Sequence, residues 1–299
     1  MKYSMDLKRY LREKKKIIDD YLKKYLSEKK RDRNCPKILR EAMSYALIGS
    51  GKRVRPILSL AGYEAAGGKS DTILPVAASL ELVHTYSLIH DDLPAMDDDD
   101  FRRNKPAVHK VFGEGTAILA GDALLTDAFH IISRSDASPK ILINIITELA
   151  HASGPEGMVG GQTVDLLLEG KKARKKDLLY IHTHKTGALI RASVRIGALM
   201  ANASPSKLNA LTEYGEKAGL AFQIIDDILD ITGTKEELGK ATGADSARGK
   251  NTYPSAFGLQ QSHRMAETLI SDSLNAVKIF NEKADALTEI ARYILARRN

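Results

Sequence analysis

The chain has 299 residues, 43% of them hydrophobic, and this length can form one large domain or two ordinary ones. Its single cysteine excludes an internal disulfide and argues against a soft-metal site. The net charge of +7 suggests nucleic acid, an anionic membrane or a phosphorylated small substrate as partner, but the lack of Trp and of aromatic residues among the basic ones argues against nucleic acid.

Residues 7–26 carry apolar side chains at three- and four-residue spacing with Lys and Arg between them, which predicts an amphipathic helix. Its basic face could lie on a membrane, but we favour a helix that packs on the core with its charges in water. No apolar run follows the charged residues 8–16, and no window reaches the roughly eighteen apolar residues of a spanning helix. We therefore expect a cytosolic protein without a membrane span.

A second helix is predicted over residues 39–48, and it ends in the sequence Gly-Ser-Gly-Lys-Arg-Val-Arg-Pro at 49–56. The amides and the three cations of this turn could hold an anion, and the alternative is a solvated basic loop. The turn is not a P-loop, which needs a longer glycine-rich spacing and a Ser or Thr after the Lys.

Long segments rich in Ala and Leu make up most of the remaining chain, and they are too long and too poor in β-branched residues to be strands. They predict helices over residues 57–66, 74–89, 116–133, 140–151, 178–201, 206–232, 253–274 and 276–297. No linker between them is long or polar enough to separate two domains. We expect an all-α protein in which residues 1–299 form a single domain.

Residues 91–100 contain six carboxylates in ten positions, directly after an apolar run. Six like charges repel one another unless cations neutralise them. Taken alone, this stretch is equally compatible with a solvated acidic loop and with a site for hard divalent cations.

A second acidic cluster, Asp226, Asp227 and Asp230, lies inside an otherwise apolar segment. On a helix, Asp226 and Asp230 would share one face, about 6 Å apart along the axis. Carboxylates in an apolar helix are costly to bury unless they are paired or bound to metal, so the two clusters indicate facing walls that share cations. Mg²⁺ takes few carboxylates from a protein and completes its shell with water and phosphate, which predicts a di- or polyphosphate substrate.

The sequence motifs occur in an order that resembles a known enzyme family. They are Gly51-Lys52-Arg53-Val54-Arg55-Pro56, Asp91-Asp92 with Asp97 and then Arg102-Arg103, Gly160-Gly161-Gln162 with Asp165, Lys185-Thr186, Asp226-Asp227 with Asp230, Gly239-Lys240, and Gly249-Lys250-Asn251-Thr252-Tyr253-Pro254. Along nearly its whole length the chain resembles the trans-isoprenyl diphosphate synthases, and within them the bacterial farnesyl diphosphate synthases.

The resemblance implies a helical bundle around a deep central cavity, working as a homodimer, with both aspartate motifs at the cavity mouth. It implies that three Mg²⁺ ions bind the diphosphate of an allylic substrate, and that the ligands are Asp91, Asp92, Asp97, Asp226 and Asp230. Cationic contacts to the same diphosphate would come from Arg102, Lys185, Lys240 and Lys250. The metal ions would make the diphosphate a better leaving group by neutralising the charge that develops on it.

Ionisation of the allylic substrate would leave a carbocation, which isopentenyl diphosphate attacks to extend the chain by five carbons. By the resemblance, the Lys185 carbonyl, the Thr186 hydroxyl and the Gln223 amide oxygen face this cation, while Arg102 completes the expected catalytic set. Apolar walls would keep water away from the cation.

Isopentenyl diphosphate would be held without metal ions, so that it is not ionised. The residues that match the family's positions for this cationic pocket are Lys52, Arg55, His84 and Arg103, and Arg suits bidentate contacts with phosphate. Taken alone, His84 would be an ordinary helix histidine. Its place seven residues before Asp91, two turns away on the same helical face, favours the site.

The spacing within the first motif requires a break in the helix. On an ideal helix Asp91 and Asp97 would lie about 240° apart, so an undistorted helix cannot bring both to one metal ion. We expect Pro94 to break the helix locally, so that the two extra residues relative to the shorter form in the family bulge out.

Tyr86 lies five residues before Asp91, about 7.5 Å deeper along the helix. In the family, an aromatic residue here forms the cavity floor of enzymes that stop at fifteen carbons, and this resemblance makes Tyr86 and its neighbour Ser87 the expected chain-length residues. The alternative is that Tyr86 is an ordinary core residue.

We therefore expect a Mg²⁺-dependent prenyltransferase that makes (2E,6E)-farnesyl diphosphate from isopentenyl diphosphate and dimethylallyl or geranyl diphosphate. A geranylgeranyl diphosphate synthase is the near alternative, and a terpene cyclase or an inert partner subunit of a larger synthase are more distant ones. A cyclase needs no isopentenyl site, and an inert subunit would be expected to lack one acidic cluster. Residues 239–254, rich in Gly and cations, are expected to close over bound diphosphate.

Overall fold

Most of the chain is helical in a computed structural model, which describes residues 5–31, 34–49, 51–171, 173–232 and 251–297. The first half contains α1 (Leu7–Arg31), α2 (Lys37–Leu47), α3 (Val54–Ala66), η1 (Asp71–Ile73), α4 (Leu74–Asp91), α5 (Val108–Phe112), α6 (Glu114–Ser133) and α7 (Pro139–Ser153). The second half contains α8 (Met158–Leu168), α9 (Lys175–Ile181), η2 (His182–Gly187), α10 (Ala188–Met200), α11 (Pro205–Thr232), α14 (Tyr253–Phe257), α15 (Leu259–Ala276), η3 (Val277–Ala284) and α16 (Asp285–Ala296). Within the described ranges the strands are a single short hairpin, β1 (Phe101–Arg102) with β2 (Lys105–Pro106), so the all-α prediction is confirmed.

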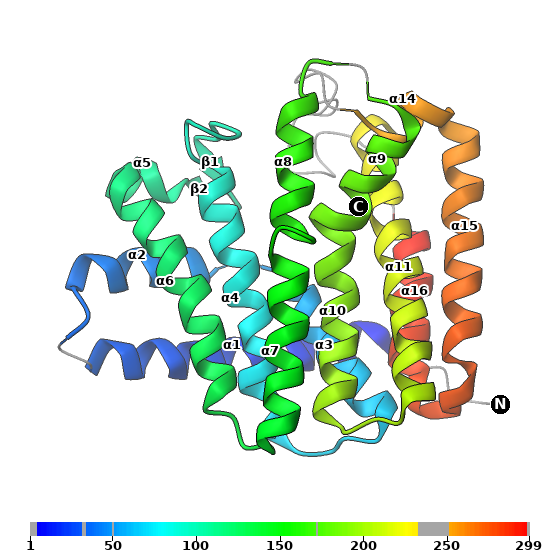
Figure 1. Cartoon of the computed structure of the whole chain (residues 1–299), viewed down its shortest axis with the longest axis horizontal. Helices are drawn as coiled ribbons and strands as arrows, with labels where there is room; N and C mark the ends of the chain where they lie inside the picture. Colours follow the sequence, from blue (N-terminus) through cyan, green and yellow to red (C-terminus); the bar gives the residue numbers. More distant parts are fainter. Residues whose placement is uncertain (1–4, 32–33, 50, 172, 233–250, 298–299) are drawn as a thin grey trace.

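The long helices stand side by side in a bundle, and α1 crosses behind them (Figure 1). Helix α4 contacts α6, α3 contacts α10, and α11 lies between α10 and α15. The carboxy-terminal ends of α4 and α11, which carry the two acidic clusters, both lie at the upper end of the bundle in this view. The fold therefore brings two clusters that are far apart in the sequence to the same end of the molecule.

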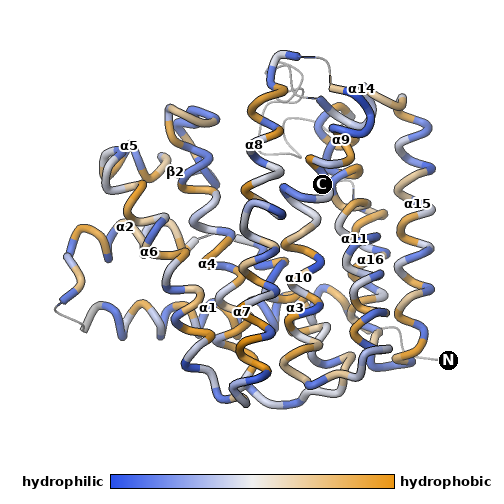
Figure 2. Tube along the Cα trace, viewed as in Figure 1, coloured by the Kyte–Doolittle hydropathy of each residue, from blue (hydrophilic) through white to orange (hydrophobic). Residues whose placement is uncertain are grey.

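Burial of apolar faces explains the packing. One group of buried side chains joins α2, α4, α6 and α7, and a second joins α11, α15 and α16, with α1, α3 and α10 contributing to both. Along α15 hydrophobic and hydrophilic residues alternate, as expected for a helix with one covered face (Figure 2). Helices α3 and α10 approach so closely that a Cβ added at Gly197 would lie 2.1 Å from the Ser59 carbonyl oxygen. Glycine at this crossing is what permits the contact.

The apolar face of the predicted amino-terminal helix packs onto the core, as we favoured from its pattern. Ile18 and Leu22 of α1 are fully buried, and Asp19 of the same helix pairs with Arg53 beyond α2. The apolar face of α1 is therefore buried inside the protein.

Several predicted boundaries are wrong. The predicted helix 253–274 is broken at Gly258, whose φ is 82°. The predicted helix 276–297 is broken at Asn281, whose φ is 51°. Both φ values lie outside the helical region. The segment 178–201 contains a turn of π-helix, η2. Helix α8, the short α5 and the β hairpin were not predicted.

Two described segments, 71–91 and α6, are long and apolar enough to cross a membrane by length and composition alone. In the first segment, 67% of the apolar window is buried inside the protein, as in a core helix, while in α6 the buried share is 39%. By itself this composition is weak support for a membrane span.

Candidate active site

A cavity of about 460 Å³ opens between α4, α8 and η2. It brings together residues that the sequence assigned to four different roles, and these are Arg55, His84, Tyr86, Ser87, Asp91, Lys185 and Thr186. A smaller adjoining pocket of about 110 Å³ shares Lys185 and Thr186 and adds Asp165, Gln223 and Asp227. The η2 turn is therefore a common wall between the α4 side and the α11 side of the site.

Helix α4 ends at Asp91, and the following residues fold back over its terminus. The Asp97 amide donates to the Asp91 carbonyl at 2.8 Å, and the Asp98 amide donates to the Leu93 carbonyl at 3.1 Å. Pro94 lies within this turn, and the helix stops at Asp91, where a local break was expected. The tight turn places Asp97 beside Asp91 without any helical register between them.

The pKa of one buried carboxyl in each acidic cluster is raised. Burial raises the pKa of the Asp91 carboxyl to about 6, Lys185 opposes this shift, and Asp97 adds to it. Burial also raises the pKa of Asp226, on α11, to about 6, against the opposing effect of Arg297, whose guanidinium lies 2.8 Å away. Asp230 follows Asp226 by one turn of α11 and is half-buried. Buried carboxylates with raised pKa values, offering only oxygen ligands, suit Mg²⁺, which would stabilise their ionised forms.

The expected ligands do not form one compact group. Among the described residues, the His, Cys, Asp or Glu side chains whose ligand atoms come within 4.8 Å of one another in a group of three are Asp98, Asp100 and His109, near the hairpin. Asp100 is paired with Lys110 at 2.7 Å, which supplies a countercharge. The wide separation of the two acidic clusters is compatible with ions that take one or two carboxylates each and bind phosphate at their remaining positions.

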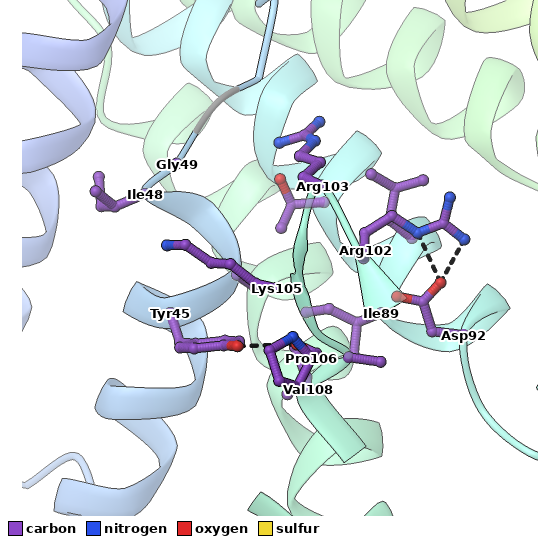
Figure 3. Close-up of a pocket in the computed structure, with 14 residues that line it drawn as sticks. Tyr45, Ile48, Gly49, Ile89, Asp92, Arg102, Arg103, Lys105, Pro106 and Val108 are labelled. Carbon is purple, nitrogen blue, oxygen red and sulfur yellow. Dashed lines mark hydrogen bonds and ion pairs between the residues drawn. The ribbon is translucent and has the colours of Figure 1, made fainter. Parts of the chain in front are cut away.

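Asp92 is oriented toward the hairpin. It is 2% exposed, and its Oδ1 accepts from the Arg102 guanidinium, whose Nε lies 2.8 Å away (Figure 3). Arg102 also pairs with Asp99 at 3.0 Å, and the Tyr45 hydroxyl, on α2, donates to the Pro106 carbonyl at 2.9 Å. In this arrangement Asp92 holds Arg102 in place and does not line the large cavity, unlike Asp91.

The cationic side of the cavity contains Arg55 and a neutral histidine. Burial, together with the charges of Arg55 and Arg103, holds the pKa of His84 well below its usual range, so its imidazole can donate a hydrogen bond without adding charge. Burial also lowers the pKa of Arg55 to about 10, which leaves the guanidinium protonated at neutral pH.

Only some of the residues predicted to bind isopentenyl diphosphate lie close together in the structure. Arg103 packs against the turn before α3, since a Cβ added at Gly51 would lie 2.7 Å from its Nη1. Lys52 is exposed and lines a separate, largely apolar pocket of about 430 Å³. Within the described part of the chain, Arg55 Nε and both amide atoms of Gln162 are buried at the site without a hydrogen-bond partner, which indicates a polar ligand.

Helix α8 positions Lys185. A Cβ added at Gly161 would lie 2.1 Å from the Lys185 backbone nitrogen, so only glycine allows α8 to approach η2 this closely. The Asp165 carboxylate, one turn further along α8, accepts from Lys185 Nζ at 2.6 Å. Both Lys185 and Thr186 lie in the π-helical turn, a distortion that occurs often at functional sites.

A buried residue that the sequence reading did not single out fixes the cationic turn. Arg53 is 2% exposed and has a left-handed φ of 54°. Its guanidinium donates to Glu81 on α4 at 2.6 Å, to Asp19 on α1 at 2.8 Å and to the Leu47 carbonyl at 2.8 Å. This network ties three helices to the turn that carries Lys52 and Arg55.

Replacing Arg53 by Met is expected to lower the free energy of unfolding by about 3–5 kcal/mol, because the buried Glu81 carboxylate loses its partner at 2.6 Å and keeps only Arg103, at 4.0 Å. Chemical denaturation of the purified variant measures the change. The double variant Arg53→Met with Glu81→Leu should lose less than Arg53→Met alone, since removing both charges abolishes the desolvation penalty. Equal stability of Arg53→Met and wild type would contradict this role.

Two expected ligands of the allylic diphosphate, Lys240 and Lys250, and most of the predicted closing loop 239–254, lie outside the described residues. From that segment the structure describes Asn251, whose Nδ2 donates to the Lys171 carbonyl at 3.0 Å, and Thr252, which caps α14.

Comparison with known proteins gives consistent matches over most of the chain. Residues 36–292 match the family model described as Polyprenyl synthetase. The chain is 42% identical over 296 residues to a farnesyl diphosphate synthase of Geobacillus stearothermophilus, covering 98% of both chains. It is 44% identical over 299 residues to a geranylgeranyl diphosphate synthase of Cyanophora paradoxa, covering 99% of this chain and 98% of that one. A solved geranylgeranyl pyrophosphate synthetase of Pyrococcus horikoshii superimposes with a TM-score of 0.88 at 30% identity, over 98% of each chain.

Proposed function

The chain belongs to the polyprenyl synthetase family and is a prenyltransferase, and we propose that its product is (2E,6E)-farnesyl diphosphate, made from isopentenyl diphosphate with dimethylallyl and then geranyl diphosphate. Relatives of similar identity carry both farnesyl and geranylgeranyl names, so the argument for fifteen carbons comes from the cavity. Tyr86 is 6% exposed, lines the cavity below Asp91, and meets His90 edge to face at 5.7 Å between ring centroids. We infer that this aromatic pair closes the cavity before a further five-carbon unit can be added.

The family uses Mg²⁺ with diphosphate substrates. In this chain the two acidic clusters fit the metal, and we assign three ions to Asp91, Asp97, Asp226 and Asp230, with Asp92 in support through Arg102. Mg²⁺ at this site would supply Lewis-acid stabilisation of the departing diphosphate. Lys185 and Arg102 would bind the same diphosphate, together with Lys240 and Lys250.

The remaining residues of the site act on the hydrocarbon and on the second substrate. The Lys185 carbonyl, the Thr186 hydroxyl and the Gln223 amide oxygen direct partial negative charge at the allylic cation. Arg55, with Lys52 and Arg103, binds the diphosphate of isopentenyl diphosphate. His84, held neutral by its surroundings, donates a hydrogen bond to it without weakening the neighbouring guanidiniums through repulsion.

We also propose that residues 1–299 act as one catalytic domain in the cytosol, with no nucleic-acid partner. The family match to residues 36–292 and the burial of segment 71–91 in the core support this assignment. A geranylgeranyl product is the alternative that the relatives' names leave open.

One assay tests the proposal. Purified protein is incubated with Mg²⁺, labelled isopentenyl diphosphate and each allylic primer in turn, and the product length is measured by chromatography. Fifteen-carbon product is expected from dimethylallyl and geranyl primers, and a twenty-carbon product would overturn the length assignment alone. The absence of any chain-extended product would overturn the whole proposal.

A second copy of the chain is the expected partner of α6. Although α6 is as apolar as a spanning helix, only 39% of its apolar window is buried, and Ile118 and Leu119 are exposed, Leu119 by 60%. We expect Leu119→Asp to weaken a homodimer at least about 100-fold, because two symmetry-related leucines leave the interface and each contributes roughly 1.5–3 kcal/mol when buried. Light scattering over a concentration series measures the dissociation. Ile279→Asp in η3, also exposed, is the matched control, and equal dimerisation of both variants would contradict the role of α6.

A further inference from the structure

The side chain of Asp227 is buried between three elements and points in a different direction from that of its neighbour Asp226. It is 4% exposed. Its Oδ2 accepts from His182 Nε2 at 2.9 Å and from the Tyr253 amide at 2.9 Å, and its Oδ1 accepts from Gln223 Nε2 at 3.0 Å. Three donors on one buried carboxylate indicate a structural anchor with a fixed orientation.

The donors to Oδ2 are themselves held in place. His182 Nδ1 lies 2.8 Å from the Leu178 carbonyl oxygen, and its ring meets the Tyr253 ring edge to face at 4.9 Å between centroids. The Tyr253 amide is the first of the short helix α14, which Thr252 caps. The carboxylate of Asp227 therefore cannot rotate without breaking contacts to η2 and α14.

This anchoring determines how the Gln223 amide is turned. A side-chain amide has one accepting and one donating end, and an ionised carboxylate can only accept. The NH₂ group of Gln223 must therefore face Asp227, and the oxygen is left for the pocket that Gln223 lines together with Lys185 and Thr186. Which end faces the pocket decides the sign of the partial charge presented there.

We propose that Asp227 is a positioning residue that orients the Gln223 amide so that its oxygen, and not its NH₂ group, faces the allylic cation. This role rests on the proposed function, because it requires a cationic reacting centre in the pocket. A carbonyl dipole aimed at a developing positive charge stabilises it, whereas an NH₂ group in the same place would oppose it.

Asp227→Asn reverses the arrangement with a minimal change of shape. The oxygen of the introduced amide stays at the Oδ2 position, because the Tyr253 backbone N–H can only donate there, so the introduced NH₂ group takes the Oδ1 position and faces Gln223. Gln223 then turns its oxygen toward that NH₂ group and its own NH₂ group toward the pocket. We expect kcat to fall about 100-fold, as when one preorganised dipole is lost, with the KM values of both substrates changing less than about threefold.

A compensating substitution gives the test its specificity. Combining Asp227→Asn with Gln223→Glu keeps the total charge and returns an oxygen to the pocket, because one oxygen of the new carboxylate accepts from the introduced NH₂ group. The single Gln223→Glu variant places two carboxylates against each other and is expected to lose activity. We expect the double variant to recover at least about tenfold in kcat over either single variant.

Steady-state kinetics and thermal unfolding of wild type, both single variants and the double variant decide the question, with the exposed Asp136→Asn as control for the chemical change. Unchanged kcat in Asp227→Asn, or a folded double variant no more active than Gln223→Glu, would overturn the positioning role. If Asp227→Asn fails to fold, the comparison of the double variant with Gln223→Glu still decides. An inactive wild type would overturn the proposed function, which separates that failure from the loss of the positioning role alone.

Discussion

Replacing Asp91 with asparagine is expected to lower kcat at least about 1,000-fold and, in the same protein, to raise the stability of the metal-free state. The activity falls because metal ions contribute several kcal/mol of charge stabilisation to such reactions, and about 4 kcal/mol corresponds to 1,000-fold in rate. Asp91 is thus expected to be important for catalysis and, in the metal-free protein, to lower the stability of the fold.

The stability gain follows from the pKa of Asp91, which burial raises to about 6. A group whose pKa is higher in the folded than in the unfolded state stabilises the fold at low pH, and this contribution is lost as the pH rises through the folded value. Metal-free wild type should therefore lose about 1–2 kcal/mol between pH 4 and pH 7 through this carboxyl, allowing for its partial exposure. Asparagine cannot ionise, so the variant avoids that loss.

Thermal unfolding in the presence of EDTA at pH 5 and at pH 8 measures the effect. The melting temperature of Asp91→Asn should exceed that of wild type at pH 8, with a smaller difference at pH 5, while Asp136→Asn shows none. Mg²⁺ with inorganic diphosphate should stabilise wild type more than the variant. A less stable variant at pH 8, or a variant that retains turnover, would contradict the role given to Asp91.

The acidic clusters could be predicted from the sequence because each consists of carboxylates that are neighbours along the chain. Six like charges at 91–100 and three carboxylates in an apolar segment at 226–230 require neutralisation wherever the chain places them. The all-α fold class could also be predicted, since the segments are long and rich in Ala and Leu. Both inferences depend on composition and periodicity, which a single sequence contains.

Other features depend on contacts between distant residues and could not be read from the sequence in this way. Nothing in the pattern says that Arg102 will hold Asp92, or that Arg53, among three neighbouring cations, is the one that is buried against Glu81. Gly161 packs against the Lys185 backbone, which is more than twenty residues away, and no local pattern predicts that contact.

Replacing Tyr86 with alanine is expected to shift the main product from fifteen to twenty carbons or more. Tyr86 lines the cavity on the deep side of Asp91, and its ring is fixed against His90, whose Nε2 lies 3.0 Å from the Ile118 carbonyl. Removing the ring leaves space at the place where the growing chain ends. Because Tyr86→Ala removes none of the cationic contacts proposed for isopentenyl diphosphate, the KM for that substrate should change less than about threefold.

Product analysis with geranyl and farnesyl diphosphate as primers separates a chain-length role from a role in core packing. Tyr86→Phe keeps the ring and should retain fifteen-carbon product, while Ser87→Ala, at the neighbouring lining position, should have a smaller effect than Tyr86→Ala. A pure core residue would lose about 3–5 kcal/mol on truncation to alanine without a change in product length. Because Tyr86 is 6% exposed, truncation should lower stability in either role, and the product length is the deciding measurement. An unchanged product distribution together with a large loss of stability would therefore assign Tyr86 to the core, and the length of the product would have to be set elsewhere in the cavity.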